Sequence, residues 1–333
     1  MKFNSITICL DMHGCPNRCK HCWVGHAPNG NLSVDDLRWT AAQFRPYTDI
    51  LEVDDWYREP DFHDDYKALW ELCENLSDRH HPHFELVSVW RLVRDPEYVD
   101  WLKSLGLKTA QLTLFGGEEK TDLYTGRQGA YRDIMRAMEI LQTHQITPRI
   151  QVFVNKETLP ELPLVEALGE ENCFVHQGSC DGENERFYDI WVTPEDLRKI
   201  PPRLAASTLR HFGKESLAEV FGSTEQALYA RLINDHSTAS LAEADPVFYI
   251  DSRFNVYPNF TAPSPAWLLG NLKADGIEQV LKTYVNDESL AQHVRKTVPV
   301  SELVRAGGDP DSRRLFGRGD YIDLLLNRYC RHT

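Results

Sequence analysis

The sequence has no apolar run approaching the roughly 20 residues of a membrane-spanning helix, which argues against such a span. Positive charge is also scarce. Only 36 lysines and arginines stand against 50 aspartates and glutamates, so the net charge is −14. Binding to nucleic acid or to an anionic membrane requires clustered basic residues, so neither partner is expected. The N-terminus has no signal-peptide pattern, and a cytoplasmic location is the expectation.

A disulfide framework is not expected either, although eight cysteines are present. Disulfide scaffolds are usually shorter and secreted, whereas 333 residues with 42% hydrophobic content suffice for a sizeable core. In a reducing compartment, closely spaced thiols more often bind metal. Cys15, Cys19 and Cys22 form such a group within one short segment.

Strand and helix signals alternate along the first half of the chain. Short runs rich in Val, Ile, Leu and Phe, bounded by turn or polar residues, predict strands at residues 6–10, 50–53, 84–89, 110–115, 149–154 and 173–176. Helices are predicted at residues 33–44, 61–76, 96–105, 130–144 and 162–168. Because parallel strands need crossover connections, this order predicts an α/β fold with a parallel sheet. Ligands of such sheets bind beyond the carboxyl ends of the strands.

The second part of the chain has a different pattern. Residues 193–235 are predicted to be mostly helical, and residues 248–257 to form a hairpin that turns near Ser252. A helix at residues 277–284 and a polar tail are predicted to complete the chain. We therefore predict a domain boundary between residues 190 and 191.

The cysteine segment, Cys-Pro-Asn-Arg-Cys-Lys-His-Cys at residues 15–22, follows the first predicted strand. Thiolates are the usual ligands of iron–sulfur clusters, and three of them can bind three irons of a cubane and leave the fourth iron open. The C-x3-C-x2-C spacing resembles the signature of the radical S-adenosylmethionine (SAM) superfamily. The alternative interpretation is a structural zinc site with a fourth ligand such as His13, His21 or His26.

The resemblance implies a cofactor chemistry and a fold. The open iron would bind SAM, and an electron from the cluster would break the S–C5′ bond to give a 5′-deoxyadenosyl radical. One [4Fe–4S] cluster, SAM, and a reducing partner such as flavodoxin or ferredoxin are therefore expected. Residues 1–190 would form a partial (β/α)6 TIM-like barrel, and residues 191–333 a C-terminal α+β cap.

Two SAM contacts follow from the same resemblance. His21, directly before the third cysteine, takes the position that usually packs beside the adenine. Superfamily members carry a Gly-Gly-Glu-Pro-like turn after the second strand that holds the SAM amino group. This chain has Glu59-Pro60 there, with both glycines replaced. Glu118 ends a literal Gly-Gly-Glu but follows the fourth strand, so the order of elements favours Glu59. A carboxylate that favours a helix start is the alternative role of Glu59.

Residues 112–117 and 125–131 resemble the fourth strand and following loop of the SPASM/twitch subgroup. Thr113 takes a position where members often use Ser for the SAM carboxylate. Arg136 on the next helix would bind that carboxylate through its guanidinium fork. Asn155, at the end of the fifth strand, would contact the ribose. A surface or turn role is the alternative for each of these three residues.

Residues 250–259 and 269–272 also resemble the SPASM/twitch region, with one departure. The family usually has a cysteine after Tyr-Pro as a ligand of an auxiliary cluster, and this chain has Asn259. The only cysteine beyond residue 180 is Cys330, and one thiolate cannot hold a cluster that normally takes four. We therefore expect a single cluster. Because auxiliary clusters often remove an electron, their loss favours redox-neutral chemistry: epimerisation, rearrangement, elimination or decarboxylation.

An epimerase needs a hydrogen-atom donor, and a thiol suits that role. Cys180, after the sixth predicted strand, is the best-placed candidate, and an inert buried cysteine is the alternative. Residues 54–57 are expected to line the substrate pocket. The leading hypothesis is a radical SAM enzyme that tailors a small polar metabolite. Modification of a ribosomally made peptide is the second hypothesis, and a non-catalytic zinc or iron–sulfur binding protein is the third.

Overall fold

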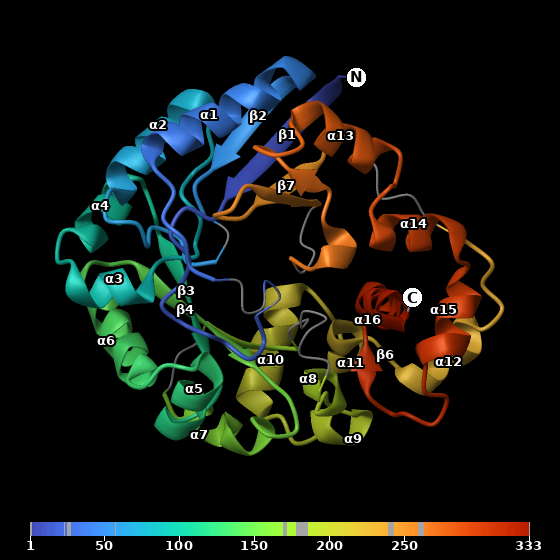
Figure 1. The fold of residues 1–333 in the computed structure, drawn as a ribbon. Coiled ribbons are helices and arrows are strands. Elements are labelled where there is room, and N and C mark those ends of the chain that lie inside the picture. The colour runs from blue at the N-terminus through green and yellow to red at the C-terminus, as the bar shows by residue number, and fades with distance from the viewer. Residues whose placement is uncertain are drawn as a thin grey trace. The chain divides into compact units, whose positions relative to one another are not determined.

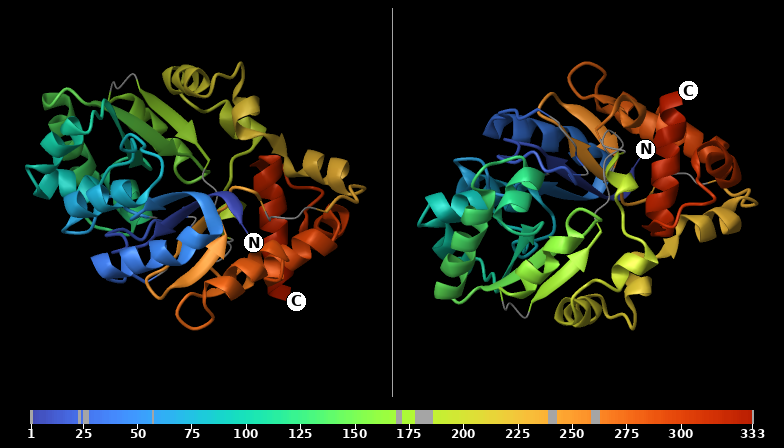
Figure 2. Two further views of the ribbon diagram at one scale, coloured as in Figure 1. Left: turned by 90° about the horizontal axis from the view of Figure 1, so that it is seen from above. Right: turned by 90° about the horizontal axis from the view of Figure 1, so that it is seen from below.

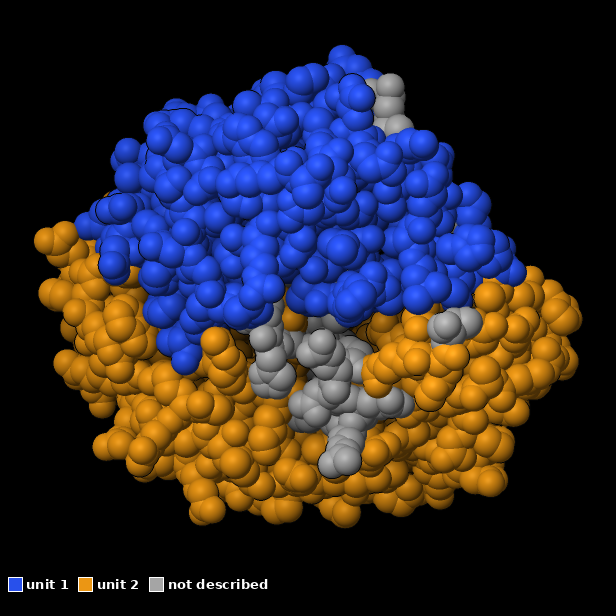
Figure 3. Space-filling model, in the orientation of Figure 1, with its two compact units in different colours: residues 1–16, 26–83, 238–297 blue, residues 17–25, 84–237, 298–333 orange. Residues whose placement is uncertain are grey.

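The computed structural model describes residues 2–22, 24, 28–56, 58–168, 172–177, 186–238, 243–258 and 263–332. The chain divides into two compact units, which are coloured separately in Figure 3. Unit 1 contains residues 1–16, 26–83 and 238–297, and unit 2 contains residues 17–25, 84–237 and 298–333. Neither unit ends at residue 190, so the boundary expected there stays a prediction.

Unit 1 is organised by a five-stranded sheet of order β2-β1-β7-β8-β9. β1 (Phe3–Leu10) pairs in parallel with β2 (Thr48–Asp54) and, on its other side, with β7 (Val247–Ile250) from the C-terminal part of the chain (Figure 1). β8 (Asn255–Pro258) and β9 (Gly270–Asn271) continue the sheet in antiparallel pairing. The predicted hairpin is therefore confirmed. β7 pairs with the first strand, and the C-terminal cap at residues 191–333 stays a prediction.

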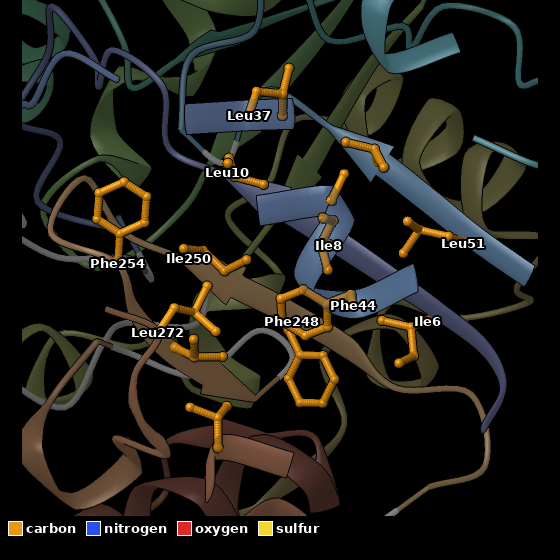
Figure 4. Close-up of a cluster of buried hydrophobic side chains, with 14 of the residues drawn as sticks. Ile6, Ile8, Leu10, Leu37, Phe44, Leu51, Phe248, Ile250, Phe254 and Leu272 are labelled. Carbon is orange, nitrogen blue, oxygen red and sulfur yellow. The ribbon is translucent and has the colours of Figure 1, made fainter. Parts of the chain in front are cut away.

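Alternation along β1 separates an apolar face from a polar one. Ile6, Ile8 and Leu10 are fully buried and pack in a cluster with Phe44 and Phe248 (Figure 4). The intervening residues of the strand are only half-buried. This period of two is what a strand with one face on the core produces. The helices of unit 1 are α1 (Val34–Phe44), α2 (Tyr66–Leu76), α13 (Ile277–Val285) and α14 (Leu290–Thr297), with 3-10 turns η1 (Arg45–Tyr47) and η4 (Pro265–Trp267).

Unit 2 contains a parallel sheet of order β3-β4-β5, whose strands lie side by side in Figure 2. The strands are β3 (Thr109–Leu114), β4 (Thr147–Phe153) and β5 (Cys173–His176), close to three of the predicted ranges. The helices α3 (Val89–Arg94), α4 (Tyr98–Ser104), α5 (Glu118–Thr125), α6 (Ala130–Thr143) and α7 (Leu162–Glu166), with the 3-10 turn η2 (Leu159–Glu161), belong to this part. α6 packs on β3 and β4.

The strand predicted at residues 84–89 is wrong. Only one isolated bridge, between Leu86 and Gln111, forms there. Phe84 and Leu86 are exposed whereas Val87 is buried, so the apolar residues of the run do not share one buried face. Ser88 instead accepts a hydrogen bond from the backbone of Arg91 and caps α3.

The polar tail predicted after residue 284 is also wrong. α14, α15 (Val300–Gly307) and α16 (Arg318–His332) occupy it, and Val304, Tyr321 and Leu325 are fully buried. The predicted helical character of residues 193–235 is confirmed by α9 (Pro194–Leu197), α10 (Pro202–Phe212), α11 (Leu217–Phe221) and α12 (Glu225–Leu232). α8 (Arg186–Asp189) precedes them, and β6 (Ser223–Thr224) pairs with β10 (Leu315–Phe316).

The predicted α/β class is thus confirmed, with parallel strands in two separate open sheets. Within the described part of the chain, no helix has both the length and the apolar character needed to cross a membrane.

Candidate functional site

The three motif cysteines are divided between the units by the chain: Cys15 belongs to unit 1, and Cys19 and Cys22 belong to unit 2. All three are half-buried, and the backbone N–H of Cys22 donates to the carbonyl of Cys19 at 3.1 Å. Among the described residues, no three His, Cys, Asp or Glu side chains converge on a single metal ion. A cubane does not require such convergence, because each thiolate binds a different iron.

The loop before Cys15 is fixed by a close backbone approach. Gly14 has φ +97°, and a Cβ there would lie 2.3 Å from Oδ1 of Asn29, so only glycine fits. That Oδ1 accepts from the backbone N–H of Cys15 at 3.2 Å, and Nδ2 of Asn29 donates to the carbonyl of Cys15 at 3.0 Å. Asn29 thereby holds both backbone groups of Cys15.

Arg58 occupies the position of the second missing glycine in the turn after β2. Its Nη2 and Nε donate to Oδ2 of Asp11 at 2.6 and 3.0 Å, and both side chains are only 3% exposed. The hydroxyl of Tyr249 on β7 donates to the same oxygen at 3.1 Å, and Nη2 of Arg58 also donates to the carbonyl of Pro28 at 3.2 Å. A buried ion pair thus connects β1, the turn after β2 and the hairpin. No local motif indicates this pair, because its two residues lie 47 positions apart in the sequence.

The same turn brings Glu59 to Cys15. The thiol Sγ of Cys15 lies 3.9 Å from Oε2 of Glu59 within unit 1. Glu118, the other candidate, is 55% exposed at the start of α5 and pairs with Arg132. The structure therefore places Glu59 beside the first motif cysteine, and its contact with SAM stays a prediction.

A small pocket in unit 1 lies beside this turn and is lined by Asp11, Met12, His13, Gly14, Asp55, Trp56, Glu59, Asp61, Phe62 and His63. Burial, followed by the charges of Asp61 and Asp54, raises the pKa of Asp55 to about 7. Burial also raises the pKa of Asp54 to about 6. Nε2 of His83 lies 2.9 Å from Oδ2 of Asp61, and both side chains are buried. Of the expected pocket residues 54–57, Asp55 and Trp56 do line a pocket, and Tyr57 lies outside the described residues.

In unit 2, the cysteine segment is held against the end of α5. The backbone N–H of Arg18 donates to the carbonyl of Thr125 at 2.8 Å, and the N–H of Lys20 donates to the carbonyl of Tyr124 at 2.8 Å. The ammonium of Lys20 also lies 4.8 Å from the centre of the Tyr124 ring. The segment that carries Cys19 therefore packs along the last turn of α5.

The turn after α5 fits the same segment. Gly126 has φ +64°, and a Cβ there would lie 2.8 Å from the carbonyl oxygen of Arg18. Nε of Arg127 donates to Oδ1 of Asn17 at 2.7 Å, and its Nη1 pairs with Asp133 at 2.5 Å. The Thr-Gly-Arg turn belongs to the stretch that carries the resemblance, but these contacts were not predicted from it.

His21 lies in an aromatic environment. Its ring centre is 3.9 Å from that of Phe153, at the end of β4, and 4.8 Å from that of Phe115, just after β3. Burial, with a smaller contribution from His176, lowers the pKa of His21 to about 3, so the ring is neutral. Its Nδ1 is buried without a hydrogen-bond partner among the described residues.

The other residues predicted for the site lie in different environments. Thr113 is half-buried on β3, opposite Gln151 of β4. Arg136 is 61% exposed on α6 and pairs with Glu139 at 2.7 Å, a surface role. Cys180 lies outside the described residues.

Asn155 is fully buried and has a structural role. Its Oδ1 accepts from the backbone N–H groups of Glu157 at 2.8 Å and Thr158 at 3.0 Å, and its Nδ2 donates to the hydroxyl of Tyr124 at 3.2 Å. These bonds close the turn after β4 and leave the side chain directed into the protein. The turn role, and not the ribose contact, accounts for its environment.

Comparisons with known proteins agree with the motif. Residues 10–162 match the Radical SAM superfamily. A search of curated proteins finds no match. The solved structure of native anSMEcpe with bound AdoMet and Cp18Cys peptide is similar at a TM-score of 0.53 and 14% identity, covering 98% of this chain and 97% of that one.

Two further structures are similar. Native anSMEcpe with bound AdoMet has a TM-score of 0.54 and 14% identity, covering 98% of this chain and 97% of that one. Streptococcus suis SuiB bound to the precursor peptide SuiA has a TM-score of 0.43 and 15% identity, over 77% and 59% of the two chains. At these identities the likeness to anSMEcpe concerns the fold. Residues 10–162 carry a radical SAM domain, and enzymes of that superfamily use a [4Fe–4S] cluster and SAM.

Proposed function

We propose that Cys15, Cys19 and Cys22 hold one [4Fe–4S] cluster at which SAM is reductively cleaved, and that the resulting radical abstracts a hydrogen atom from the substrate. The observation that carries this proposal is the C-x3-C-x2-C segment directly after β1, inside the range that matches the superfamily. The cluster supplies the electron, and SAM supplies the radical. The protein must position both and exclude water.

The residues present fit these cofactors. Three thiols are the donor type that iron–sulfur clusters use, and Asn29 and Gly14 fix the backbone around the first of them. Glu59, close to Cys15, would accept a hydrogen bond from the amino group of SAM. The ring of His21, whose Nδ1 has no hydrogen-bond partner among the described residues, gives a flat surface and a polar atom suited to the adenine. Thr113 remains a candidate for the SAM carboxylate. Arg136 and Asn155 do not, because other contacts account for them.

The fold assigned to this site is a partial (β/α)6-type barrel. Parallel pairing of β1 with β2, and of β3, β4 and β5 in chain order, supports it. The net reaction proposed is a redox-neutral tailoring step on a small polar metabolite: epimerisation, rearrangement, elimination or decarboxylation. Its support is the single remaining cysteine, Cys330, beyond residue 180. A flavodoxin or ferredoxin would supply the electron.

Anaerobic reconstitution tests the proposal. We expect a brown protein with about four irons per chain that forms 5′-deoxyadenosine from SAM when a reductant is added. Cys19→Ser should lose both properties, whereas Cys330→Ala, which removes a cysteine outside the motif, should keep them. A colourless protein that retains one zinc, or a four-iron protein inert toward SAM, would contradict the proposal.

A peptide substrate is the second candidate, because the chain aligns over 98% of its length with a peptide-bound structure of anSMEcpe. The product distinguishes the two reaction types once a substrate is known. Uptake of solvent deuterium at the attacked carbon supports epimerisation, and loss of that uptake in Cys180→Ala identifies the donor. Deuterium uptake that persists in this variant would remove Cys180 from the mechanism.

A further inference from the structure

One face of the sheet in unit 2 carries a continuous row of polar side chains. Gln111 on β3 and Gln151 on β4 lie on the same face as His176, the last residue of β5, and all three are half-buried. Nε2 of Gln111 lies 2.8 Å from Oε1 of Gln151, and Nε2 of Gln151 lies 3.4 Å from Nδ1 of His176. Nη2 of Arg149 donates to Oε1 of Gln111 at 3.1 Å. Four side chains thus form one hydrogen-bonded row.

The direction of these bonds is set by Arg149. A guanidinium can only donate, so the Gln111 atom it contacts must be the carbonyl oxygen. The amide nitrogen of Gln111 then faces Gln151 and donates, which requires the carbonyl oxygen of Gln151 at that contact. The amide nitrogen of Gln151 consequently faces His176. Arg149 is itself held by an ion pair with Glu85, so the row begins at a fixed point.

A donor aimed at Nδ1 determines the state of the His176 ring. Nδ1 must be the unprotonated acceptor, and the ring proton must reside on Nε2. Burial, with His211 as a smaller cause, lowers the pKa of His176, in keeping with a neutral ring. No described residue forms a hydrogen bond with Nε2 of His176. The row therefore presents an N–H donor at the carboxyl end of β5.

The position of the His176 Nε2–H donor indicates which ligand group it would contact. His21 and His176 both contact the ring of Phe153, with ring centres 3.9 and 5.7 Å from it. The proposed function places the adenine of SAM against the His21 ring, and the present inference rests on that proposal. Asn155, the residue expected at the ribose, is buried in a turn.

We propose that the Arg149–Gln111–Gln151 row holds His176 as the Nε2–H tautomer, and that this N–H donates to a ribose hydroxyl oxygen of the bound SAM. His176 is then a SAM-binding residue, and Gln151 is a positioning residue that acts through it. A nucleoside is the expected ligand class, because the donor stands beside a flat aromatic surface.

Gln151→Glu tests this with almost no change in shape. A carboxylate accepts where the amide donated, so His176 must place its proton on Nδ1 and lose the Nε2–H donor. Nitrogen-15 spectra of the histidine rings distinguish the two tautomers in the apo-protein. We expect the Nε2–H form for His176 in the wild type and the Nδ1–H form in Gln151→Glu, whereas an Nε2–H ring in both proteins would contradict the inference. Gln142→Glu, on the exposed side of α6, adds the same charge and should leave the ring unchanged.

The second measurement is the affinity of the reconstituted protein for S-adenosylhomocysteine, which lacks the sulfonium charge. Loss of one hydrogen bond should weaken binding about three- to tenfold in both Gln151→Glu and His176→Phe. His176→Gln, which keeps an N–H donor, should recover part of the loss. An Nδ1–H tautomer in the wild type, or unchanged affinity in His176→Phe, would overturn the inference. If only the inference fails, the wild type still forms 5′-deoxyadenosine; if the proposed function fails, it forms none.

Discussion

At the scale of single residues, the ion pair of Arg58 and Asp11 places two buried charges against each other in unit 1. Both side chains are withdrawn from water, and removal of either partner leaves an uncompensated buried charge. The pair replaces the flexibility of the usual glycine turn with a fixed anchor beside Glu59. The chain therefore retains the acidic residue of the motif, and the Arg58–Asp11 ion pair holds the turn that carries it.

Arg58→Met should lower the free energy of unfolding of the apo-protein by about 3–5 kcal/mol, because Asp11 would remain buried without its counter-charge, although the Tyr249 hydroxyl would still donate to it. Arg136→Met is the matched control. It breaks an exposed pair with Glu139 and should cost less than about 1 kcal/mol. Urea unfolding followed by circular dichroism measures both values. Equal losses in the two variants would show that burial of the pair is energetically unimportant.

Asp55 should make stability depend on pH. Its folded-state pKa of about 7 exceeds the ordinary 3.8, because burial and the carboxylates of Asp61 and Asp54 disfavour its charge, with His83 opposing them weakly. The folded state therefore binds the proton more tightly than the unfolded state does. This contribution is fully present below about pH 4 and is lost as pH rises through about 7.

Asp55→Asn should accordingly stabilise the apo-protein at pH 8 by about 2 kcal/mol and have little effect at pH 4. Unfolding curves of the wild type and the variant across this range give the difference. An exposed carboxylate, changed in Asp35→Asn, should show no such trend. A difference for Asp55→Asn that grows toward acid would contradict the assigned direction of the pKa shift.

At the scale of elements, the end of α5 and its following turn shape the cysteine segment. Gly126→Ala combines two penalties: a left-handed φ of +64° and a Cβ 2.8 Å from the carbonyl of Arg18. Gly129→Ala shares the positive φ, +81°, but its Cβ would meet nothing nearer than 3.8 Å. We expect about 1 kcal/mol of destabilisation for Gly129→Ala and about 1–3 kcal/mol more for Gly126→Ala.

The same pair of variants reports on the segment itself. Displacement of Arg18 should accelerate alkylation of Cys19 in the reduced apo-protein for Gly126→Ala, and much less for Gly129→Ala. Mass spectrometry of the labelled peptide measures these rates. Indistinguishable rates would mean that the turn does not hold the segment.

Elements were predictable where the apolar period was regular. Four of the five confirmed strands bury alternate residues, and β5 buries three residues in succession. In the run at residues 84–89, Phe84 and Leu86 are exposed, which composition does not reveal. The predicted helix at residues 61–76 begins only at Tyr66, since Asp61 has φ +54° and pairs with His83. In α16, charged residues interrupt the apolar period around Leu325, so the sequence pattern predicts a polar tail where the structure has a helix.

Predictions about the candidate site were possible where the spacing along the chain is short. Cys15 and the choice of Glu59 over Glu118 needed only local motifs and the order of strands. Arg136 lies two residues, about 200°, from Ile134 on the helix, so its outward direction was available from the period. The contacts of Arg58 with Asp11 and Tyr249 depend on tertiary pairing between distant segments, which one sequence does not disclose.

At the scale of the whole molecule, the first sheet is built from two distant parts of the chain, because β7, β8 and β9 join β1 and β2. β1 has β2 on one side and β7 on the other, and residues 238–297 belong to unit 1. A fragment that ends at the predicted boundary lacks β7, β8 and β9. It would expose one edge of β1 and part of the apolar cluster that includes Phe248.

We therefore expect fragment 1–190 to aggregate or to unfold without a cooperative transition, whereas the full chain unfolds cooperatively. Co-expression of residues 191–333 as a separate chain should restore soluble material, because it supplies β7 to the edge of β1. Size-exclusion chromatography and thermal unfolding measure both outcomes. A soluble fragment 1–190 with a sharp transition would instead establish residue 190 as a domain boundary. The pairing of β7 with β1 would then be dispensable for folding of the N-terminal part.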